Sequence, residues 1–292
     1  MKLAAVLLTV CLVACAGCGG GGGAKAVSPT ASPVTLEYKT GGGQPVQYKM
    51  TSSVTVNVQG ATDTWISDIS YTVKVESIAT DGAITRRITF DDFSISSVSG
   101  GTPVPDPSAA GYKGQYLVLR MGPNGEVQDW KGLDGIHSVT AEDRDLRNVL
   151  VQQMAQLFQP LAKEPVNVGS KWQSTFEMPV EIGGGEFKQK VVTDYEVLGF
   201  GQRSGRNCAR IRLLLVTQGE GSGTQGAGRQ YWVDAQGGGK GEMWFDYDSG
   251  VIVDYNAGGT ADQNMSYERA GKEDVATETS TVDTQTKIKL VK

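Results

Sequence analysis

One long run of alternating residues constrains the fold of this chain more than any other feature. From Val46 to Gln59, a stretch of 14 residues, the even positions are apolar apart from Ser52 and every odd position is polar. A period of two predicts a β-strand with one buried face and one wet face. At ~3.4 Å per residue the strand would be about 48 Å long, so a sheet built from such strands must twist and bend.

The same alternation continues after this strand. Gly60-Ala61 is typical of a two-residue turn with glycine first, and Asp81-Gly82 predicts a second hairpin. At Asp91-Asp92 the apolar phase changes from even to odd positions, as a β-bulge would produce. We expect the positions of these strands that face the interior to carry no charged side chain.

Further strands are predicted along the rest of the chain, at 116–121, 126–130, 171–182, 191–197, 211–215, 243–247, 251–255, 265–267 and 279–291. Residues 99–114 hold three prolines among glycines and serines, which predicts a surface loop. The glycine cluster Gly219–Gly223 lacks the lysine and following helix of a phosphate-binding loop, so it is also interpreted as a loop.

A single helix is expected at about 141–161, where Thr140 and Asp143 resemble a capping box and leucines and valines form one stripe. The predicted fold class is therefore mainly β: a long antiparallel meander forming a strongly curved sheet or partly open barrel, with one amphipathic helix packed on it. The alternative is two sandwich-like halves, 34–139 and 165–292, joined by the helix.

The amino terminus predicts export. Residues 1–14 combine a basic start with an apolar stretch too short to span a bilayer, which is typical of a signal peptide. The sequence Leu12-Val13-Ala14-Cys15 resembles the lipobox of bacterial lipoproteins. That resemblance implies signal-peptidase recognition at Leu12, Val13 and Ala14, and lipidation of Cys15. Cys18 is a competing acceptor, but it lacks a leucine three places upstream.

The segment 15–33 is interpreted as lipid anchor and tether, because Gly19–Gly23 is a run of five glycines and Ser-Pro pairs follow. The folded domain then spans 34–292. Two or more acyl chains hold a protein on a membrane where one chain would not. We therefore expect a lipid-anchored protein of the cell envelope, on the periplasmic or extracellular face.

Chemistry-bearing residues are scarce. The chain has one histidine, His137, which is interpreted as a polar loop residue. Asp246, Asp248 and Gly250 resemble part of a calcium loop, but they fit a hairpin turn better. Cys208 is expected to be an isolated thiol. No cofactor or metal is predicted, and a net charge of −5 from 27 basic and 32 acidic residues argues against nucleic acid as a partner.

The β-rich body resembles uncharacterised bacterial envelope lipoproteins in style, through the segment Pro165–Trp172 and the turn Asp246–Gly250. A curved sheet holding a helix is also similar to the lipoprotein-carrier family. No functional residue is transferred from either resemblance.

Three functions are weighed. The first is non-enzymatic binding of an apolar ligand or an envelope protein partner, with a lining formed by adaptable apolar side chains, although the same side chains could simply fill a dry core. The proposed lining consists of Tyr48, Met50, Tyr71, Phe176 and Met178. The second is a structural or scaffolding lipoprotein. The third is a hydrolase with loop-borne carboxylates such as Asp91, Asp92 and Asp134.

Overall fold

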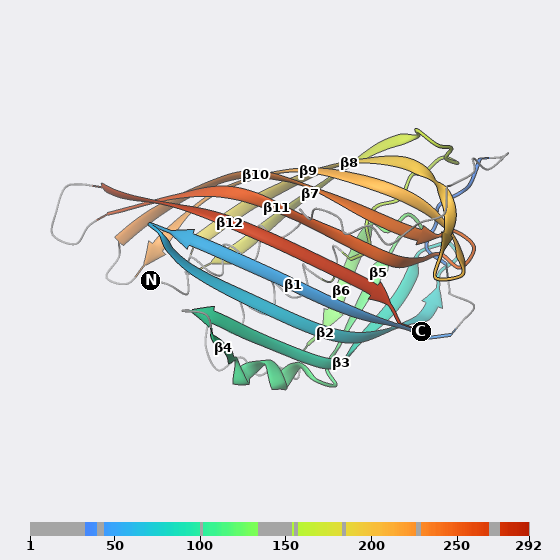
Figure 1. Cartoon of the computed structure of the whole chain (residues 1–292), viewed down its shortest axis with the longest axis horizontal. Coiled ribbons are helices and arrows are strands. Elements are labelled where there is room, and N and C mark those ends of the chain that lie inside the picture. The colour runs from blue at the N-terminus through green and yellow to red at the C-terminus, as the bar shows by residue number, and fades with distance from the viewer. Residues whose placement is uncertain are drawn as a thin grey trace.

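The computed structural model describes residues 33–39, 44–99, 102–133, 154, 157–182, 185–225, 229–268 and 275–291. Long strands dominate these residues (Figure 1). The elements are β1 (Val46–Val58), β2 (Ala61–Ile78), β3 (Ile84–Ser99), β4 (Thr102–Pro105), the 3-10 helix η2 (Pro107–Tyr112), β5 (Tyr116–Met121), β6 (Val127–Gly132), β7 (Lys171–Ile182), β8 (Gly185–Arg203), β9 (Arg206–Gln225), β10 (Arg229–Asp246), β11 (Val251–Glu268) and β12 (Val275–Leu290).

All strands belong to one 12-stranded sheet, in the order β6-β5-β3-β2-β1-β12-β11-β10-β9-β8-β7, with β4 paired to β3. Neighbouring strands in this order pair antiparallel, and most of these pairs join strands that follow one another in the sequence. The mainly β meander is therefore confirmed. The last strand, β12, pairs with β1 as well as β11, so the two halves of the chain share one sheet.

The sheet stays open, because β6 and β7 are its two ends in the strand order. Closure into a barrel is thus not seen in the described strands. Of the predicted helix at 141–161, only 154 and 157–161 are described, and 157–161 is not helical. Within the described residues η2 is the one named helix. None of the helical residues described here forms a segment long and apolar enough to cross a bilayer.

Local details of β1 to β3 follow the sequence closely. Val58 pairs with Ala61, so the turn residues are Gln59 and Gly60, both with positive φ. The turn thus begins one residue earlier than predicted and has glycine second, since two positive φ values favour glycine there. The predicted bulge is confirmed: Ser70 pairs with Asp92 and Tyr71 with Phe90, which leaves Asp91 as the extra residue.

Two segments predicted as loops contain strands. Within 99–114, the proline-containing β4 pairs with β3 off the main strand order, where a missing N–H is tolerated. The cluster Gly219–Gly223 lies inside β9, and the loop prediction was wrong. A Cβ atom built on Gly219 would lie 2.2 Å from Cζ of Phe187, so the ring on β8 covers a surface that a side chain would otherwise fill.

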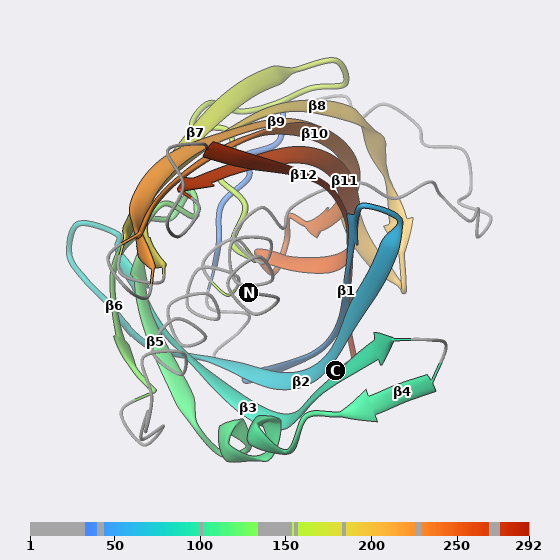
Figure 2. The same cartoon turned by 90° about the vertical axis from the view of Figure 1, so that its left-hand side faces the viewer.

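The sheet bends around its apolar face, which we call the inner face (Figure 2). Tyr38 shows this bend, because its ring lies 5.3 Å from Cζ of Arg86 on β3 and 5.4 Å from the ring of Phe245 on β10. Four strands separate β3 from β10 in the sheet order, a span of ~24 Å in a flat sheet. Both strands can reach one side chain only if the sheet curves.

Candidate functional site on the inner face of the sheet

Two chain segments fill one end of the inner face. We call residues 33–39 and 157–162 the plug, and the inner face around them the aromatic end. The Tyr38 ring packs edge-to-face on Phe158, with 5.7 Å between centroids, and its hydroxyl donates to the Gln159 carbonyl at 3.0 Å. Val34 pairs with Val166, and Leu161 N–H donates to the Asn124 carbonyl at 2.7 Å. Buried backbone polar groups of the plug are thereby satisfied.

Glycine is required where the plug meets the sheet turns. Gly125 has a φ of 90°, and a Cβ there would lie 2.6 Å from the Tyr38 ring. Gly250 has a φ of 68°, and a Cβ there would lie 2.3 Å from the Lys39 nitrogen. Both positions combine a left-handed backbone with a close approach, which glycine alone accommodates.

Arg86 places a charge inside the aromatic end, which corrects the expectation of charge-free buried phases. It is 2% exposed on β3, between the buried Ile84 and Ile88. Its Nη2 donates to the Lys39 carbonyl at 2.7 Å, and its guanidinium lies over the rings of Tyr38 and Phe158. Burial lowers the pKa of Arg86, against the opposing influence of Tyr48 and Tyr38. The signal was available in the sequence, because position 86 shares the phase of Ile84 and Ile88.

Of the five residues predicted as an apolar lining, three lie together in the core and Phe176 lies apart from them. Tyr48, Met50 and Tyr71 are buried in the main core, where the two tyrosine rings stack at 5.3 Å. Burial raises the pKa of both tyrosines well above the usual value. Phe176 is 36% exposed on β7, at the far edge of the sheet. The backbone of Met178 pairs with Gln189, and its side chain lies outside the described set.

The inner face changes character away from the plug. The strand registers align inner-face residues of β8 to β12 in three successive rows, which we call the small-residue rows. They carry four glycines, two alanines, six neutral polar side chains, three larger aliphatic side chains and no charge. The rows are Gln189-Gly219-Ala235-Gln263-Ser280, Val191-Thr217-Gly237-Ala261-Val282 and Thr193-Leu215-Gly239-Gly259-Thr284.

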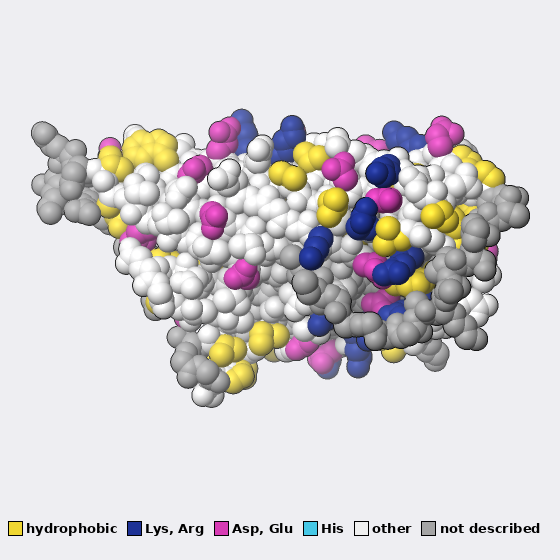
Figure 3. Space-filling view, turned by 45° about the horizontal axis from the view of Figure 1, so that its top comes forward, with side chains coloured by type: hydrophobic (Ala, Val, Ile, Leu, Met, Phe, Trp, Pro, Cys, Tyr) yellow, Lys and Arg dark blue, Asp and Glu magenta, His cyan; other side chains and the backbone are white. Residues whose placement is uncertain are grey.

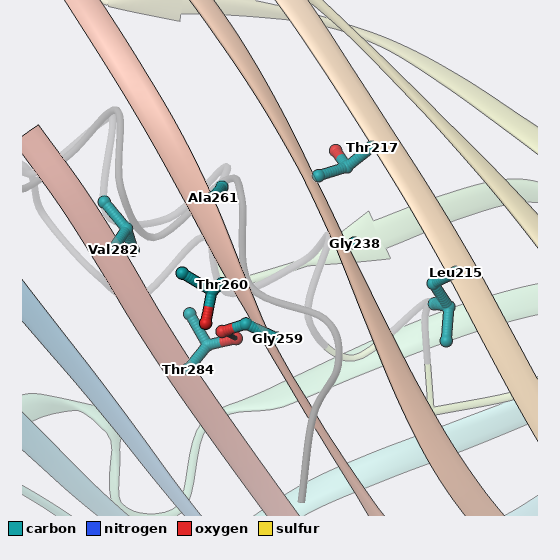
Figure 4. Close-up of a pocket in the computed structure, with 8 residues that line it drawn as sticks. All are labelled: Leu215, Thr217, Gly238, Gly259, Thr260, Ala261, Val282 and Thr284. Carbon is teal, nitrogen blue, oxygen red and sulfur yellow. Dashed lines mark hydrogen bonds between the residues drawn. The ribbon is translucent and has the colours of Figure 1, made fainter.

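A small cavity lies within these rows (Figure 4). Its volume is about 10 Å³, which is close to the space that one water molecule occupies. Its lining comes from β9 to β12: Leu215, Thr217, Gly238, Gly259, Thr260, Ala261, Val282 and Thr284. The Thr284 hydroxyl donates to the Gly259 carbonyl at 3.4 Å, and the Gln189 amide donates to the Thr217 hydroxyl at 3.3 Å. The rows therefore offer neutral hydrogen-bonding groups beside aliphatic surface.

The turn after β10 is a structural cap and fits the hairpin interpretation. The Asp246 carboxylate accepts hydrogen bonds from the backbone N–H groups of Asp248 and Ser249 at 3.0 and 3.2 Å, and from Arg206 at 2.9 Å. Although burial opposes the change, these bonds and the Ser249 hydroxyl lower the pKa of Asp246. Each of these hydrogen bonds to the Asp246 carboxylate comes from a donor group of the protein.

Cys208 lies on the other side of the sheet, in a cluster with Trp244 and Val253. It is a free thiol with no exposed surface, as an isolated thiol was predicted to be. Burial, with a further contribution from Asp246, raises the pKa of Cys208 to about 12. A thiol that stays protonated at neutral pH is a poor nucleophile.

The outer face carries mixed charges (Figure 3). Arg210 pairs with Glu242 at 2.6 Å, and Arg203 pairs with Asp254 at 2.5 Å. Both guanidinium groups lie within 6 Å of the Trp244 ring. Partly exposed pairs of this kind contribute little stability each.

The remaining predicted site residues do not form a centre. Asp91 and Asp92 lie in β3 rather than in a loop, where Asp91 accepts from Thr72 at 2.6 Å and Asp92 lies 3.6 Å from Lys113. Leu12, Val13, Ala14, Cys15, Asp134 and His137 lie outside the described residues. Within the part of the chain that is described, no three histidine, cysteine, aspartate or glutamate side chains gather as a metal site would require.

Comparison with known proteins gives little further information. No family model matches the chain, and no curated protein matches it. Among solved structures, the hypothetical lipoprotein YmcC from Escherichia coli K12 is weakly similar, with 11% identity over 81% of this chain and 85% of that one. The TM-score of 0.21 is too low for this likeness to support an argument about fold or function.

Proposed function

We propose that this protein is a lipid-anchored bacterial lipoprotein of the cell envelope, whose β-sheet domain binds an apolar ligand or an envelope partner and catalyses no reaction. One observation carries the proposal: Leu12-Val13-Ala14-Cys15 ends an apolar leader and is followed by the glycine run Gly19–Gly23. Lipidation of Cys15 would hold the domain on the periplasmic or extracellular side of a membrane. The tether would leave it free to reorient.

The described domain supports a binding role through its inner face. The sheet bends around this face, and the core residues that lie on it come from strands at both sides of the sheet. Non-polar surface with a few placed polar groups is the usual composition of a ligand site. Burial raises the pKa of the buried tyrosines Tyr38, Tyr48 and Tyr71 above the ordinary value, which moves these groups further from acid–base work near neutral pH.

The anchor is tested by metabolic labelling with palmitate and by fractionation of cells that express Cys15→Ala. We expect this variant to lose the label and to leave the membrane fraction. Cys18→Ala is the matched control, because Cys18 is the competing acceptor three residues away, and it should keep both properties. Unchanged labelling in Cys15→Ala would refute the anchor.

Ligand binding is tested separately, by native mass spectrometry of the mature chain purified from cell membranes. We expect a population whose mass exceeds that of the lipidated chain by a bound apolar molecule, which organic extraction then releases. Protein recovered without added mass from several lipid-rich preparations would contradict the binding role, while leaving the anchor intact.

A further inference from the structure

An exposed tryptophan lies on the outer face of the sheet, far along β10 from the aromatic end. Trp232 is 41% exposed near the start of β10, whereas Trp244 near the end of the strand is 5% exposed. The Trp244 indole also donates a hydrogen bond to Glu242 at 2.9 Å. A lone exposed apolar side chain is ordinary on a protein surface, so the groups around Trp232 decide whether it has a role.

Trp232 lines a hollow in the outer face. The volume of this hollow is about 520 Å³, and a second hollow of about 740 Å³ adjoins it. Both volumes fall in the range of ~300 to 1,000 Å³ that is usual for ligand sites. The two hollows form one open groove, which we call the Trp232 groove, because they share Lys188, Glu220, Asp234 and Asn264.

The strand registers show how the Trp232 groove is built. Three successive rows of outer-face residues from β8 to β11 line it, and neighbouring rows are ~7 Å apart along the strands. The rows are Glu186-Ser222-Trp232-Ser266, Lys188-Glu220-Asp234-Asn264 and Lys190-Gln218-Gln236-Asp262. Trp232 supplies the aromatic surface of these rows, and every other side chain in them carries an ionic, amide or hydroxyl group.

The polar side chains of the middle row make few contacts with one another. Around Trp244, by contrast, the arginine side chains of the outer face are paired with carboxylates. Among the described residues, no ion pair or side-chain hydrogen bond engages Lys188 or Glu220, although their strands pair them directly. Asp234 accepts one long hydrogen bond from Asn264, at 3.4 Å. Much of the hydrogen-bonding capacity of this row is therefore free for a ligand.

The chemistry of a sugar ring matches this arrangement. A sugar ring has a face of C–H groups and a rim of hydroxyl groups. The Trp232 indole offers a flat apolar surface for such a face. Carboxylates such as Glu220 and Asp234 accept hydroxyl protons in charge-assisted hydrogen bonds, and the Asn264 amide can both donate and accept. The groove thus presents a stacking surface next to acceptors and donors, within the space that a short oligosaccharide needs.

The charges of the groove favour a neutral ligand. Carboxylates outnumber ammonium groups there, so an acidic sugar would meet repulsion. Lys188 lies beside Glu220 in the middle row, so a cationic ligand would meet repulsion as well. The carboxylates are those of Glu177, Glu186, Glu220, Asp234 and Asp262, and the ammonium groups are those of Lys188 and Lys190.

We propose that the Trp232 groove binds a neutral oligosaccharide, with one sugar ring stacked on Trp232 and a neighbouring ring hydrogen-bonded to Glu220 and Asp234. This inference goes beyond the proposed function. The groove lies on the outer face, so it requires neither the apolar inner face nor the lipid anchor, and its test can fail without affecting either of them.

The test uses the mature chain, residues 15–292, carrying Cys15→Ser so that no acyl chain is attached. The neutral probes are cellotetraose, maltotetraose, mannotetraose and tetra-N-acetylchitotetraose, with tetragalacturonate as the acidic probe and tetralysine as the cationic probe. Saturation-transfer NMR detects binding, and titration calorimetry gives dissociation constants. We expect at least one neutral tetrasaccharide to bind, and tetragalacturonate to bind at least about tenfold more weakly.

The variants remove the stacking surface and the acceptors separately. Trp232→Ala should weaken binding of the neutral tetrasaccharide at least about tenfold, and Glu220→Gln and Asp234→Asn should each weaken it roughly threefold to tenfold. Trp130→Ala is the matched control for the ring, because Trp130 is 39% exposed on β6, outside the groove. Asp283→Asn is the control for charge, because Asp283 is exposed on β12 of the same face. Both controls should keep the wild-type affinity.

Several outcomes would overturn the inference. Failure of all four neutral tetrasaccharides to bind would do so, and wild-type affinity in Trp232→Ala would mean that the sugar binds elsewhere on the chain. Equal affinity for tetragalacturonate would contradict a neutral ligand, and binding of tetralysine alone would mean that the groove accepts a cationic peptide instead. If Trp232→Ala lowers the unfolding temperature, the charge variants, which replace exposed side chains by others of the same shape, decide the result: wild-type affinity in both would overturn the inference.

Discussion

The aromatic end and the small-residue rows lie on the same face of one sheet, yet they solve the burial of that face differently. At the aromatic end, large side chains from the strands meet Tyr38 and Phe158 of the plug. In the small-residue rows, glycine, alanine and threonine replace them, and the side-chain oxygens of Gln189 and Gln263 have no hydrogen-bond partner. The two halves of the inner face are therefore filled in different ways, one by large rings and the other by small and neutral polar side chains.

The largest expected effect comes from removing the central ring of the aromatic end. Tyr38→Ala should lower the free energy of unfolding by ~3 to 5 kcal/mol, because the ring contacts Phe158, Phe245 and Arg86. In the other half, Val54→Ala should cost about 2 kcal/mol, because it removes two methyl groups from a small cluster. Urea unfolding measures both, and equal losses would erase the distinction between the two ends.

The next largest effect on the free energy of unfolding is expected at Gly250, where the plug lies close to a turn of the sheet. Gly250→Ala should destabilise by ~2 to 3 kcal/mol, because a Cβ there meets the Lys39 nitrogen and the residue has a φ of 68°. Gly60→Ala is the matched control, since its φ of 84° carries the same strain but no atom lies within 4 Å. It should cost about 1 kcal/mol. If the control is as damaging as Gly250→Ala, the plug does not press on this turn.

The Asp246 cap at the aromatic end should appear in the pH dependence of stability. The pKa of Asp246 is lower in the folded chain than its ordinary value of 3.8, so its contribution is present above that value and is lost as the pH falls through the folded pKa. Asp246→Asn should cost ~1 to 2 kcal/mol at pH 7 and make unfolding less steep below pH ~4. The exposed Asp248, which accepts from Asn207, provides the control Asp248→Asn with a smaller loss. If Asp246→Asn loses stability at acid pH as steeply as the wild type, the Asp246 carboxylate does not stabilise this turn.

The two ends also differ in how well the sequence predicts them. The alternation of polar and apolar residues predicts β1 to β3 and the bulge at Asp91, because large apolar residues occupy the buried positions of these strands. In β9 and β10 the inner phase carries Gly219, Gly237 and Gly239, so the signal for a strand disappears. Rings from neighbouring strands, such as Phe187, supply the missing surface, and that contact depends on register. The small-residue rows and their two glutamines, Gln189 and Gln263, could therefore not be found from the sequence alone.

Arg86 was missed for a different reason: charge is normally taken to mark the wet phase, whereas an arginine has a long apolar stem and a flat head that stacks on rings. The prediction of which β3 residues face the interior was correct, but the expectation that they are all uncharged was wrong. Tyr48 and Tyr71, which were predicted to line a ligand site, share a phase with the core in which they are buried. Periodicity assigns a side chain to a face and does not say whether that part of the face is filled or free.

The smallest predicted effect has the opposite sign and tests whether the aromatic end is fully optimised. Arg86 is buried and its Nε has no partner, while its one hydrogen bond joins Nη2 to the Lys39 carbonyl. Arg86→Met keeps an extended side chain beside Tyr38 and Phe158 and removes an uncompensated charge, so it should stabilise the fold by about 1 kcal/mol. Arg87→Met is the control on the exposed phase of β3, where the guanidinium bonds Glu76 at 2.5 Å, and it should be neutral or slightly destabilising. Should Arg86→Met instead destabilise by several kcal/mol, the charge would be compensated after all, and the aromatic end would depend on a buried cation as well as on its rings.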